Sequence, residues 1–180
     1  MKIKVKKSVL SELFDYLKMI IFVVVFVLIM NNFIIVNALI PSESMEDTIM
    51  TGDRIFGNRL SYLVSEPERG DIIIFKYPDD EKQLFIKRVI GLPGDIVDIR
   101  IGKVYINNSE IPLDEPYLPE SMIGGYGPYE VPEGNYFVMG DNRNRSKDSR
   151  LWDNKYVRKD QIEGKATFRY FPFNTMGTIK

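Results

Sequence analysis

The stretch MIIFVVVFVLIMNNFIIVNALIPS, residues 19–42, divides the chain into two parts because it contains no charged residue. A helix of about 20 residues spans the hydrocarbon layer of a bilayer, which is ~30 Å thick, so this stretch is long enough to cross it. A cleaved signal peptide would have a shorter apolar region of ~7–15 residues. We therefore predict a retained membrane anchor over residues 19–38, whose helix ends between Asn31-Asn32 and Val36.

The segment before the anchor, residues 1–18, is basic. It contains five lysines against only two acidic residues, Glu12 and Asp15. Positive charges beside a membrane helix favour the cytoplasmic side. We therefore expect a single-pass protein of the cell membrane, with residues 1–18 in the cytoplasm and everything after Ser42 outside.

The remaining part, residues 39–180, is predicted to be a mostly β domain. Apolar or alternating runs bounded by Gly, Pro and Asp are typical of strands. The alternation around Gly102-Lys103 indicates a hairpin, and residues 112–134, rich in Pro, Gly and Tyr, are predicted to form a connecting loop. The expected strands and the hairpin are residues 36–40, 52–56, 72–75, 83–90, 97–106, 136–139 and 166–171.

Composition excludes several kinds of catalytic site. The chain of 180 residues contains neither cysteine nor histidine, which rules out a Ser-His-Asp triad, a Cys-His pair and a Cys/His zinc site. A hydrolase of this composition must use paired carboxylates, a hard metal on oxygen ligands, or a serine or threonine with a lysine base. The part after the anchor is mildly acidic, which argues against nucleic acid as a partner.

Two hydroxyl groups lie directly after the anchor, in Pro41-Ser42-Glu43-Ser44-Met45. On an extended backbone Ser42 and Ser44 point to the same face. One could attack a carbonyl carbon while the other donates a hydrogen bond beside it. A serine-rich turn or a helix cap is the commoner reason for such a pentapeptide, so the interpretation depends on the rest of the chain.

Lys87 stands out because it lies in the apolar strand Leu84–Ile90. Alternation puts Phe85, Lys87 and Val89 on one face and Ile86, Arg88 and Ile90 on the other, so both faces are apolar. Such a lysine usually extends to water or pairs with a carboxylate. A buried, unpaired lysine instead loses its proton readily, and a neutral amine beside a serine is a general base.

A third polar cluster is Ser146-Lys147-Asp148-Ser149-Arg150. A hydroxyl group here could orient the lysine amine, and Asp148 and Arg150, two residues apart, could pair and hold the loop. The alternative is a solvated turn with a surface ion pair that contributes little to stability.

Four segments together resemble the type I signal peptidases, in the order found in that family. They are Pro41–Met45, Gly70–Phe75, Lys87–Asp95, and Gly140-Asp141-Asn142-Arg143 continuing through Arg150. The resemblance covers nearly the whole chain, anchor included, and its lysine and Gly-Asp-Asn-Arg segments are very specific. The short region between the hairpin and the last segment is similar to the compact, single-anchor enzymes of Gram-positive bacteria. The implied fold is an antiparallel β-sheet domain of signal-peptidase type.

The resemblance implies a Ser-Lys dyad in a membrane-bound serine endopeptidase that removes signal peptides from exported preproteins. Ser44 would be the nucleophile and Lys87 the general base, with an oxyanion hole made by the Ser42 hydroxyl and the Ser44 backbone N–H. The supporting residues would be Ser146, which hydrogen-bonds the lysine amine, the brace Asp148 and Arg150, and Asp141. Glu43, where the family usually has Gly, and Asp47, where it often has Pro, depart from the pattern.

Signal peptides carry small residues before the cleavage site, which calls for shallow apolar pockets. The candidates for lining them are Ile40, Met45, Phe85 and Ile86. The substrate is expected to bind as an added strand. The expected partners are exported preproteins, membrane lipid and a secretion translocon. No nucleic acid, metal or cofactor is implied.

Two other functions compete with this one. A membrane-tethered β domain that only binds exported proteins would have no use for a lysine in a buried strand. A Ser/Lys peptidase that cleaves itself or one partner, as SOS-type repressors do, would carry a DNA-binding segment in place of the anchor, and none is present. A carboxylate peptidase is disfavoured because no Asp-Thr-Gly or Asp-Ser-Gly occurs.

Overall fold

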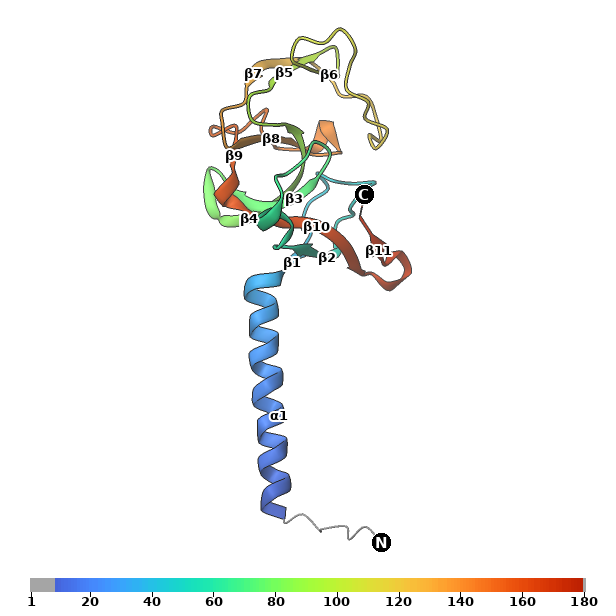
Figure 1. Ribbon diagram of the computed structural model, residues 1–180. Coiled ribbons are helices and arrows are strands. Elements are labelled where there is room, and N and C mark those ends of the chain that lie inside the picture. The colour runs from blue at the N-terminus through green and yellow to red at the C-terminus, as the bar shows by residue number, and fades with distance from the viewer. Residues whose placement is uncertain (1–8, 180) are drawn as a thin grey trace.

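A long helix and a β domain make up the computed structural model, which describes residues 9–179 (Figure 1). The lysines at the start of the chain lie outside the described residues. Helix α1 (Val9–Ile29) continues into a π-helical turn, Met30–Ile34, and all its apolar side chains are exposed. Within residues 9–179 it is the one helix long and apolar enough to cross a membrane. A helix that is apolar on every side suits a lipid environment.

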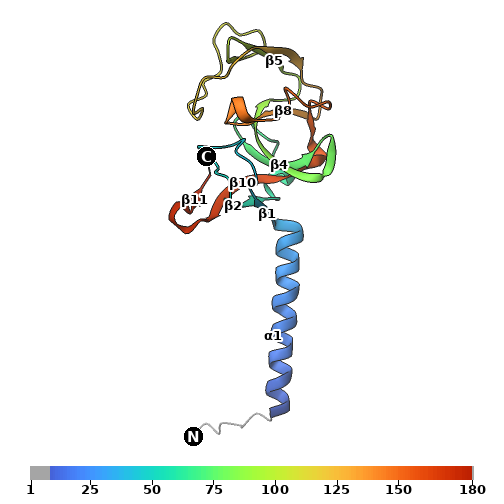
Figure 2. The same ribbon diagram turned by 180° about the vertical axis from the view of Figure 1, so that it is seen from behind.

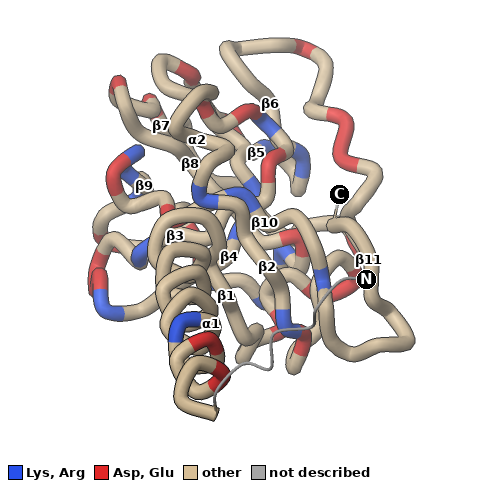
Figure 3. The backbone as a smooth tube through the Cα atoms, turned by 60° about the horizontal axis from the view of Figure 1, so that its bottom comes forward, with Lys and Arg blue, Asp and Glu red and all other residues tan. Residues whose placement is uncertain are grey.

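The helix differs from the expected anchor at both ends. It begins at Val9, ten residues earlier, and strand β1 (Ile35–Leu39) follows its last turn directly. Residues 35–38 of the expected anchor therefore belong to the β domain, where they pair with β2 (Arg54–Asn58). Charged side chains of α1 lie only near its first turns, and the rest of the helix is uncharged (Figure 3).

One antiparallel sheet forms most of the β domain, which confirms the predicted fold class. Its strand order is β1-β2-β10-β3-β4-β8-β9, with β11 paired to β10. The remaining strands are β3 (Ile72–Tyr77), β4 (Asp80–Gly91), β8 (Asn135–Met139), β9 (Val157–Arg158), β10 (Ile162–Phe171) and β11 (Gly177–Thr178). Short helical turns connect them: α2 (Ser61–Val64), η2 (Arg143–Arg145), η3 (Lys159–Gln161) and η4 (Phe173–Thr175).

A second, three-stranded sheet lies at the end of the domain far from α1 (Figures 1 and 2). It contains the predicted hairpin, β5 (Ile96–Arg100) and β6 (Lys103–Ile106), and a third strand, β7 (Tyr126–Glu130). The prediction of residues 112–134 as loop was therefore wrong for β7. Pro128 argued against a strand here, because proline cannot donate a hydrogen bond to a neighbouring strand. β7 tolerates the proline because it lies at the edge of its sheet.

The central strand β3 is buried on both faces, as its apolar run predicts. Ile73 and Phe75 pack into one core cluster with Trp152, and Ile72 and Ile74 pack into another. Its neighbour β4 pairs with β3 along residues 80–88, but with β8 only from Arg88 to Gly91. On the side of β4 that faces away from β3, residues 83–87 therefore have no strand partner within residues 9–179. We call this unpaired edge, which contains Lys87, the free edge of β4.

Candidate active site

Ser44 lies in a tight loop between β1 and β2 whose two ends are tied together. The Ile40 N–H donates to Asp53 O at 3.0 Å, and the Gly52 N–H donates back to Ile40 O at 2.8 Å. Met45 has no exposed surface and lies in the core cluster beside the loop. With both ends tied and the neighbouring side chain buried, the Ser44 hydroxyl has a fixed position.

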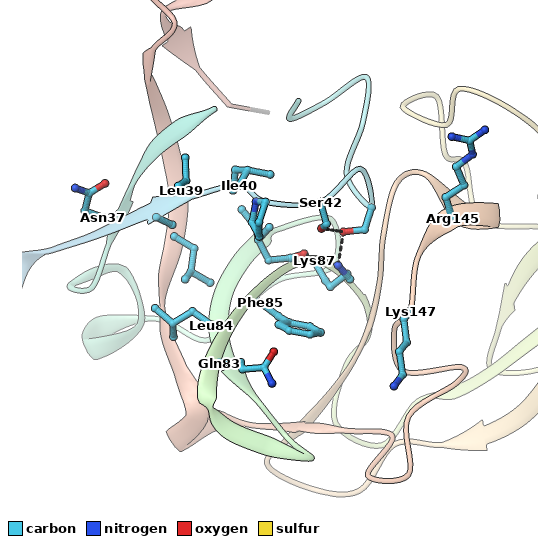
Figure 4. A pocket seen from close by; sticks show the side chains of 15 residues that line it. Asn37, Leu39, Ile40, Ser42, Gln83, Leu84, Phe85, Lys87, Arg145 and Lys147 are labelled. Atoms are coloured by element: carbon cyan, nitrogen blue, oxygen red, sulfur yellow. Dashed lines mark hydrogen bonds between the residues drawn. The ribbon is translucent and has the colours of Figure 1, made fainter. Parts of the chain in front are cut away.

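Lys87 meets Ser44 across the free edge of β4. Its Nζ lies 2.6 Å from Ser44 Oγ and donates to Ile86 O at 3.0 Å, and only 3% of the side chain is exposed (Figure 4). Within residues 9–179 no carboxylate forms an ion pair with this amine. Burial lowers the pKa of Lys87 from 10.5 to about 8, although the negative charges of Asp148 and Asp141 partly oppose the shift.

Ser42 lies beside Ser44 on the open side of the site. Its Oγ is 3.3 Å from Ser44 Oγ, and its side chain is exposed. In the part of the chain that the structure describes, the backbone N–H of Ser44 has no hydrogen-bond acceptor. Two donors, one hydroxyl and one amide, are therefore available next to the Ser44 hydroxyl.

The loop after β8 is held by a buried ion pair between Asp148 and Arg150. Arg150 donates from Nε to Asp148 Oδ1 at 2.7 Å and from Nη2 to Oδ2 at 2.8 Å. The carboxylate also accepts the Gly140 N–H at 3.0 Å. Because the aspartate side chain is fully buried and the arginine nearly so, the alternative of a solvated surface turn does not apply here.

Asp141 forms a second buried ion pair, with Arg88. The guanidinium donates to both carboxylate oxygens, at 2.9 and 2.7 Å, and Thr48 Oγ1 donates to the second oxygen at 2.6 Å. This pair joins β4 to the loop after β8 and to the loop that contains Ser44. Asp141 thus fixes the relative positions of the segments that carry the hydroxyl and the amine.

Ser146 is buried beside the site, but the expected hydrogen bond from Lys87 is not formed. Its Oγ has no hydrogen-bond partner within residues 9–179, because the lysine amine is directed to Ser44 Oγ and Ile86 O instead. A Cβ atom on Gly140 would lie 2.3 Å from both Ser146 Oγ and Ser44 O. Only glycine therefore lets Ser146 come this close to the nucleophile.

Sequence reasoning missed several residues that hold the site together. Asn142 donates its backbone N–H to Ser44 O at 3.1 Å and its side-chain amide to Glu43 O at 3.0 Å. Arg143 is fully buried and forms a two-pronged ion pair with Glu115, from the segment predicted as loop. A buried arginine indicates that a carboxylate must be near, but the sequence offers too many candidates to choose one.

A cavity of about 440 Å³ opens beside Ser44 and Lys87. Three of the candidate pocket residues, Ile40, Phe85 and Ile86, line it together with residues 37–39 of β1 and 83–84 of β4 (Figure 4). Met45 does not line it, which corrects the sequence-based expectation. Its side chain turns into the core, where Sδ accepts the Asp141 N–H at 3.4 Å.

The two acidic residues that depart from the family pattern have structural consequences. Asp47 has a φ of 72°, in the left-handed region that aspartate tolerates and proline cannot adopt. Glu43 forms an exposed ion pair with Arg145, Nη1 to Oε2 at 2.9 Å. Within residues 9–179 no group of three or more acidic side chains is arranged to hold a metal ion.

Comparison with known proteins identifies the family. The model of the family "Signal peptidase, peptidase S26" matches residues 13–171. This chain belongs to that family. It is 40% identical over 175 residues to signal peptidase I of Bacillus licheniformis, covering 91% of each chain, and 36% identical over 182 residues to signal peptidase I S of Bacillus subtilis, covering 95% of this chain and 94% of the relative.

Among solved structures, the crystal structure of a signal peptidase I from Enterococcus faecalis is 37% identical to this chain. It aligns with 57% of this chain and 97% of its own, with a TM-score of 0.49. Family membership makes the protein a serine endopeptidase that cleaves signal peptides from secreted preproteins.

Proposed function

We propose that the peptidase uses Ser44 as its nucleophile and Lys87 as its general base. The observation that carries the proposal is the 2.6 Å contact between Lys87 Nζ and Ser44 Oγ. The amine is buried, and its pKa is lowered to about 8 because burial disfavours the charged form. A useful fraction is therefore neutral near physiological pH, and a neutral amine can accept the serine proton.

In the first half of the reaction, neutral Lys87 removes the Ser44 proton as Oγ attacks the carbonyl carbon. The charge that develops on the carbonyl oxygen is stabilised by the Ser44 backbone N–H and by the Ser42 hydroxyl, whose Oγ lies 3.3 Å from Ser44 Oγ. The lysine ammonium then gives its proton to the departing amine, and the peptide bond breaks. The signal peptide remains attached to Ser44 as an ester.

In the second half, a water molecule takes the place of the departed amine. Lys87, neutral again, removes a proton from this water, which attacks the ester carbon. The Ser44 oxygen leaves and recovers its proton from the lysine, so that the enzyme returns to its starting state. A neutral amine has two N–H bonds, and Ile86 O accepts one of them. We propose that the other turns to the hydroxyl of Ser146 during the reaction, since that hydroxyl has no hydrogen-bond partner within residues 9–179 in the free enzyme.

The remaining site residues act by positioning. Asp148 and Arg150 brace the loop after β8, and Asp141 joins that loop to β4 through Arg88. Removing one partner of a buried ion pair leaves an uncompensated charge, which is strongly destabilising. We therefore expect these residues to affect catalysis through the positions of Ser44 and Lys87.

The substrate is proposed to bind as an extended strand between β1 and the free edge of β4, residues 83–87. Both segments line the cavity, and unpaired strand edges bind extended peptides through backbone hydrogen bonds. Ile40, Phe85 and Ile86 then contact the small side chains that precede the cleavage site.

Helix α1 is proposed to anchor the enzyme with its N-terminus in the cytoplasm and the β domain outside. The helix is exposed on all sides, and its connection to β1 has no linker, which keeps Ser44 close to the membrane surface. Membrane lipid and the secretion translocon are the expected neighbours there. External protease added to spheroplasts should degrade the β domain, and its protection would reject this orientation.

The deciding experiment is incubation of the detergent-solubilised protein with a radiolabelled preprotein. The wild type should release the signal peptide, and Ser44→Ala should not, although the fluorescence of the buried Trp152 should show that the variant is folded. A tethered binding domain would not need Ser44. Equal cleavage by the two proteins would reject the nucleophile.

A further inference from the structure

The cavity beside Ser44 has two chemically different ends. The apolar end is lined by Leu39, Ile40 and Leu84, whereas the other end has two cationic side chains, Arg145 and Lys147 (Figure 4). Within residues 9–179 no carboxylate lines the cavity. A peptide that crosses the cavity from end to end therefore meets apolar side chains at one end and positive charges at the other.

The direction of the substrate follows from the position of the membrane. The apolar end is formed partly by β1, which continues directly from α1, whereas Arg145 and Lys147 come from the loop after β8 (Figure 1). The apolar part of a signal peptide precedes the cleavage site and belongs near the membrane. The residues after the cleavage site therefore leave the cavity past the cationic end.

The cationic end lies close to the reacting groups. Ser146, between the two cations in sequence, approaches the backbone of Ser44, since a Cβ on Gly140 would touch both residues. An extended chain advances ~3.3 Å per residue. The first two or three residues after the cut therefore pass the loop that carries Arg145 and Lys147.

The partners of these two cations differ. Arg145 pairs with Glu43, the residue between the two serines, although 65% of the arginine side chain and 47% of the glutamate side chain are exposed. An exposed pair of this kind contributes little stability, so another carboxylate can replace Glu43 at low cost. Lys147 is exposed and forms no ion pair or hydrogen bond within residues 9–179.

We propose that Arg145 and Lys147 form a subsite for an acidic side chain among the first three residues after the cleavage site. Glu43 pairs with Arg145 in the free enzyme and is displaced by the substrate carboxylate. The inference rests on the proposed function, since it requires the reaction to take place at Ser44. It assigns a selective role to three residues that are outside the dyad.

The test uses the full-length enzyme in detergent with one preprotein in matched versions. Glu, Gln or Lys is placed in turn at each of the first three positions after the cut, and kcat/KM is measured. At low salt the wild type should prefer Glu over Lys by about three- to tenfold at one or more positions, the size expected for two exposed charge interactions. The preference should shrink at high salt.

Three variants separate the subsite from a general charge effect. Arg145→Gln combined with Lys147→Gln should bring the Glu-to-Lys ratio close to one, and Glu43→Gln should raise it, because Arg145 is then free. Lys103→Gln removes one exposed lysine of β6, in the small sheet, and should keep the wild-type ratio. Trp152 fluorescence checks that each variant is folded.

A wild type without preference, or a double variant that keeps the wild-type ratio, would overturn the subsite. A ratio unchanged in Glu43→Gln would overturn the role of that residue as an internal competitor. Failure of the proposed function is distinguishable, since it would appear as cleavage of the Gln version by Ser44→Ala. If the wild type cleaves the Gln version and Ser44→Ala does not, the assignment of Ser44 as nucleophile stands, whether or not the enzyme prefers acidic residues.

Discussion

Lys87 and Arg88 are neighbours on β4, each only 3% exposed, yet their environments differ completely. Arg88 donates to both carboxylate oxygens of Asp141 and to Gly70 O. The amine of Lys87, on the opposite face, forms its two hydrogen bonds within residues 9–179 with neutral oxygens, those of Ser44 and Ile86. The strand therefore buries one cation with a full counter-charge and one without.

This difference suits Arg88 to a structural role and Lys87 to a chemical one. A guanidinium cannot lose its proton, so a buried arginine must be paired, and the pair then joins segments that are distant in sequence. An unpaired lysine amine responds to burial by losing its proton more readily, which lowers the pKa of Lys87 to about 8. The same strand thus carries a structural tie and the proposed base at adjacent positions.

The largest expected effect comes from replacing Lys87 by arginine, so that both neighbouring residues carry a permanent charge. Lys87→Arg places a permanent charge beside Ser44, so kcat/KM for preprotein cleavage should fall by at least about 10³-fold, because guanidinium cannot act as a base. The assay is release of the signal peptide by the solubilised enzyme. Cleavage within tenfold of the wild type would show that the amine is not the base.

Removing the paired cation, Arg88, should instead lower the stability of the domain. Arg88→Met leaves Asp141 buried and unpaired, which should lower the free energy of unfolding by about 3–5 kcal/mol. Urea unfolding followed by Trp152 fluorescence measures the change, since this sole tryptophan is buried. A loss under 1 kcal/mol would mean that the Arg88–Asp141 pair does not hold the domain together.

Lys87→Met should have the opposite effect on stability although it abolishes cleavage. A lysine pKa lowered from 10.5 to about 8 corresponds to roughly 3 kcal/mol of unfavourable charge burial. That penalty is fully present below pH 8 and disappears as pH rises to about 10.5, because only the unfolded state then stays protonated. The advantage of the methionine variant should therefore be largest below pH 8. A variant less stable than the wild type at pH 7 would contradict this.

A smaller effect is expected from Asp148→Asn. The negative charge of Asp148 raises the pKa of Lys87 against the effect of burial, so its removal should lower that pKa further. The acid limb of kcat/KM should then move to lower pH, whatever the change in maximal rate. An acid limb that stays in place, or moves to higher pH, would show that Asp148 does not act on the amine electrostatically.

The difference between the two cations was only partly predictable from sequence. Alternation along Leu84–Ile90 indicated correctly that Lys87 and Arg88 occupy opposite faces of a buried strand. The partner of Arg88 could not be predicted, because Asp141 lies 53 positions away and only the folded sheet brings the two together. The resemblance to signal peptidases indicated the importance of Asp141 without indicating its partner.

For three other features the local sequence was compatible with more than one structure. The end of α1 was left open because Ile and Val suit a membrane helix and a strand equally well, and the pairing of Ile35–Leu39 with β2 decides it. The strand β7 was missed because Pro128 is a strand breaker except at an edge. Met45 was assigned to the pocket because sequence order does not show which way a side chain turns.

The most direct test of the account is the titration of the Lys87 amine itself. Full-length enzyme labelled with ¹³C at lysine Cε, in detergent micelles, gives one NMR signal for each lysine, and the spectrum of Lys87→Met identifies the signal of Lys87. We predict a midpoint near pH 8, well below that of the exposed lysines. A midpoint near the ordinary value of 10.5 would contradict the central claim that burial without a carboxylate partner makes Lys87 a base.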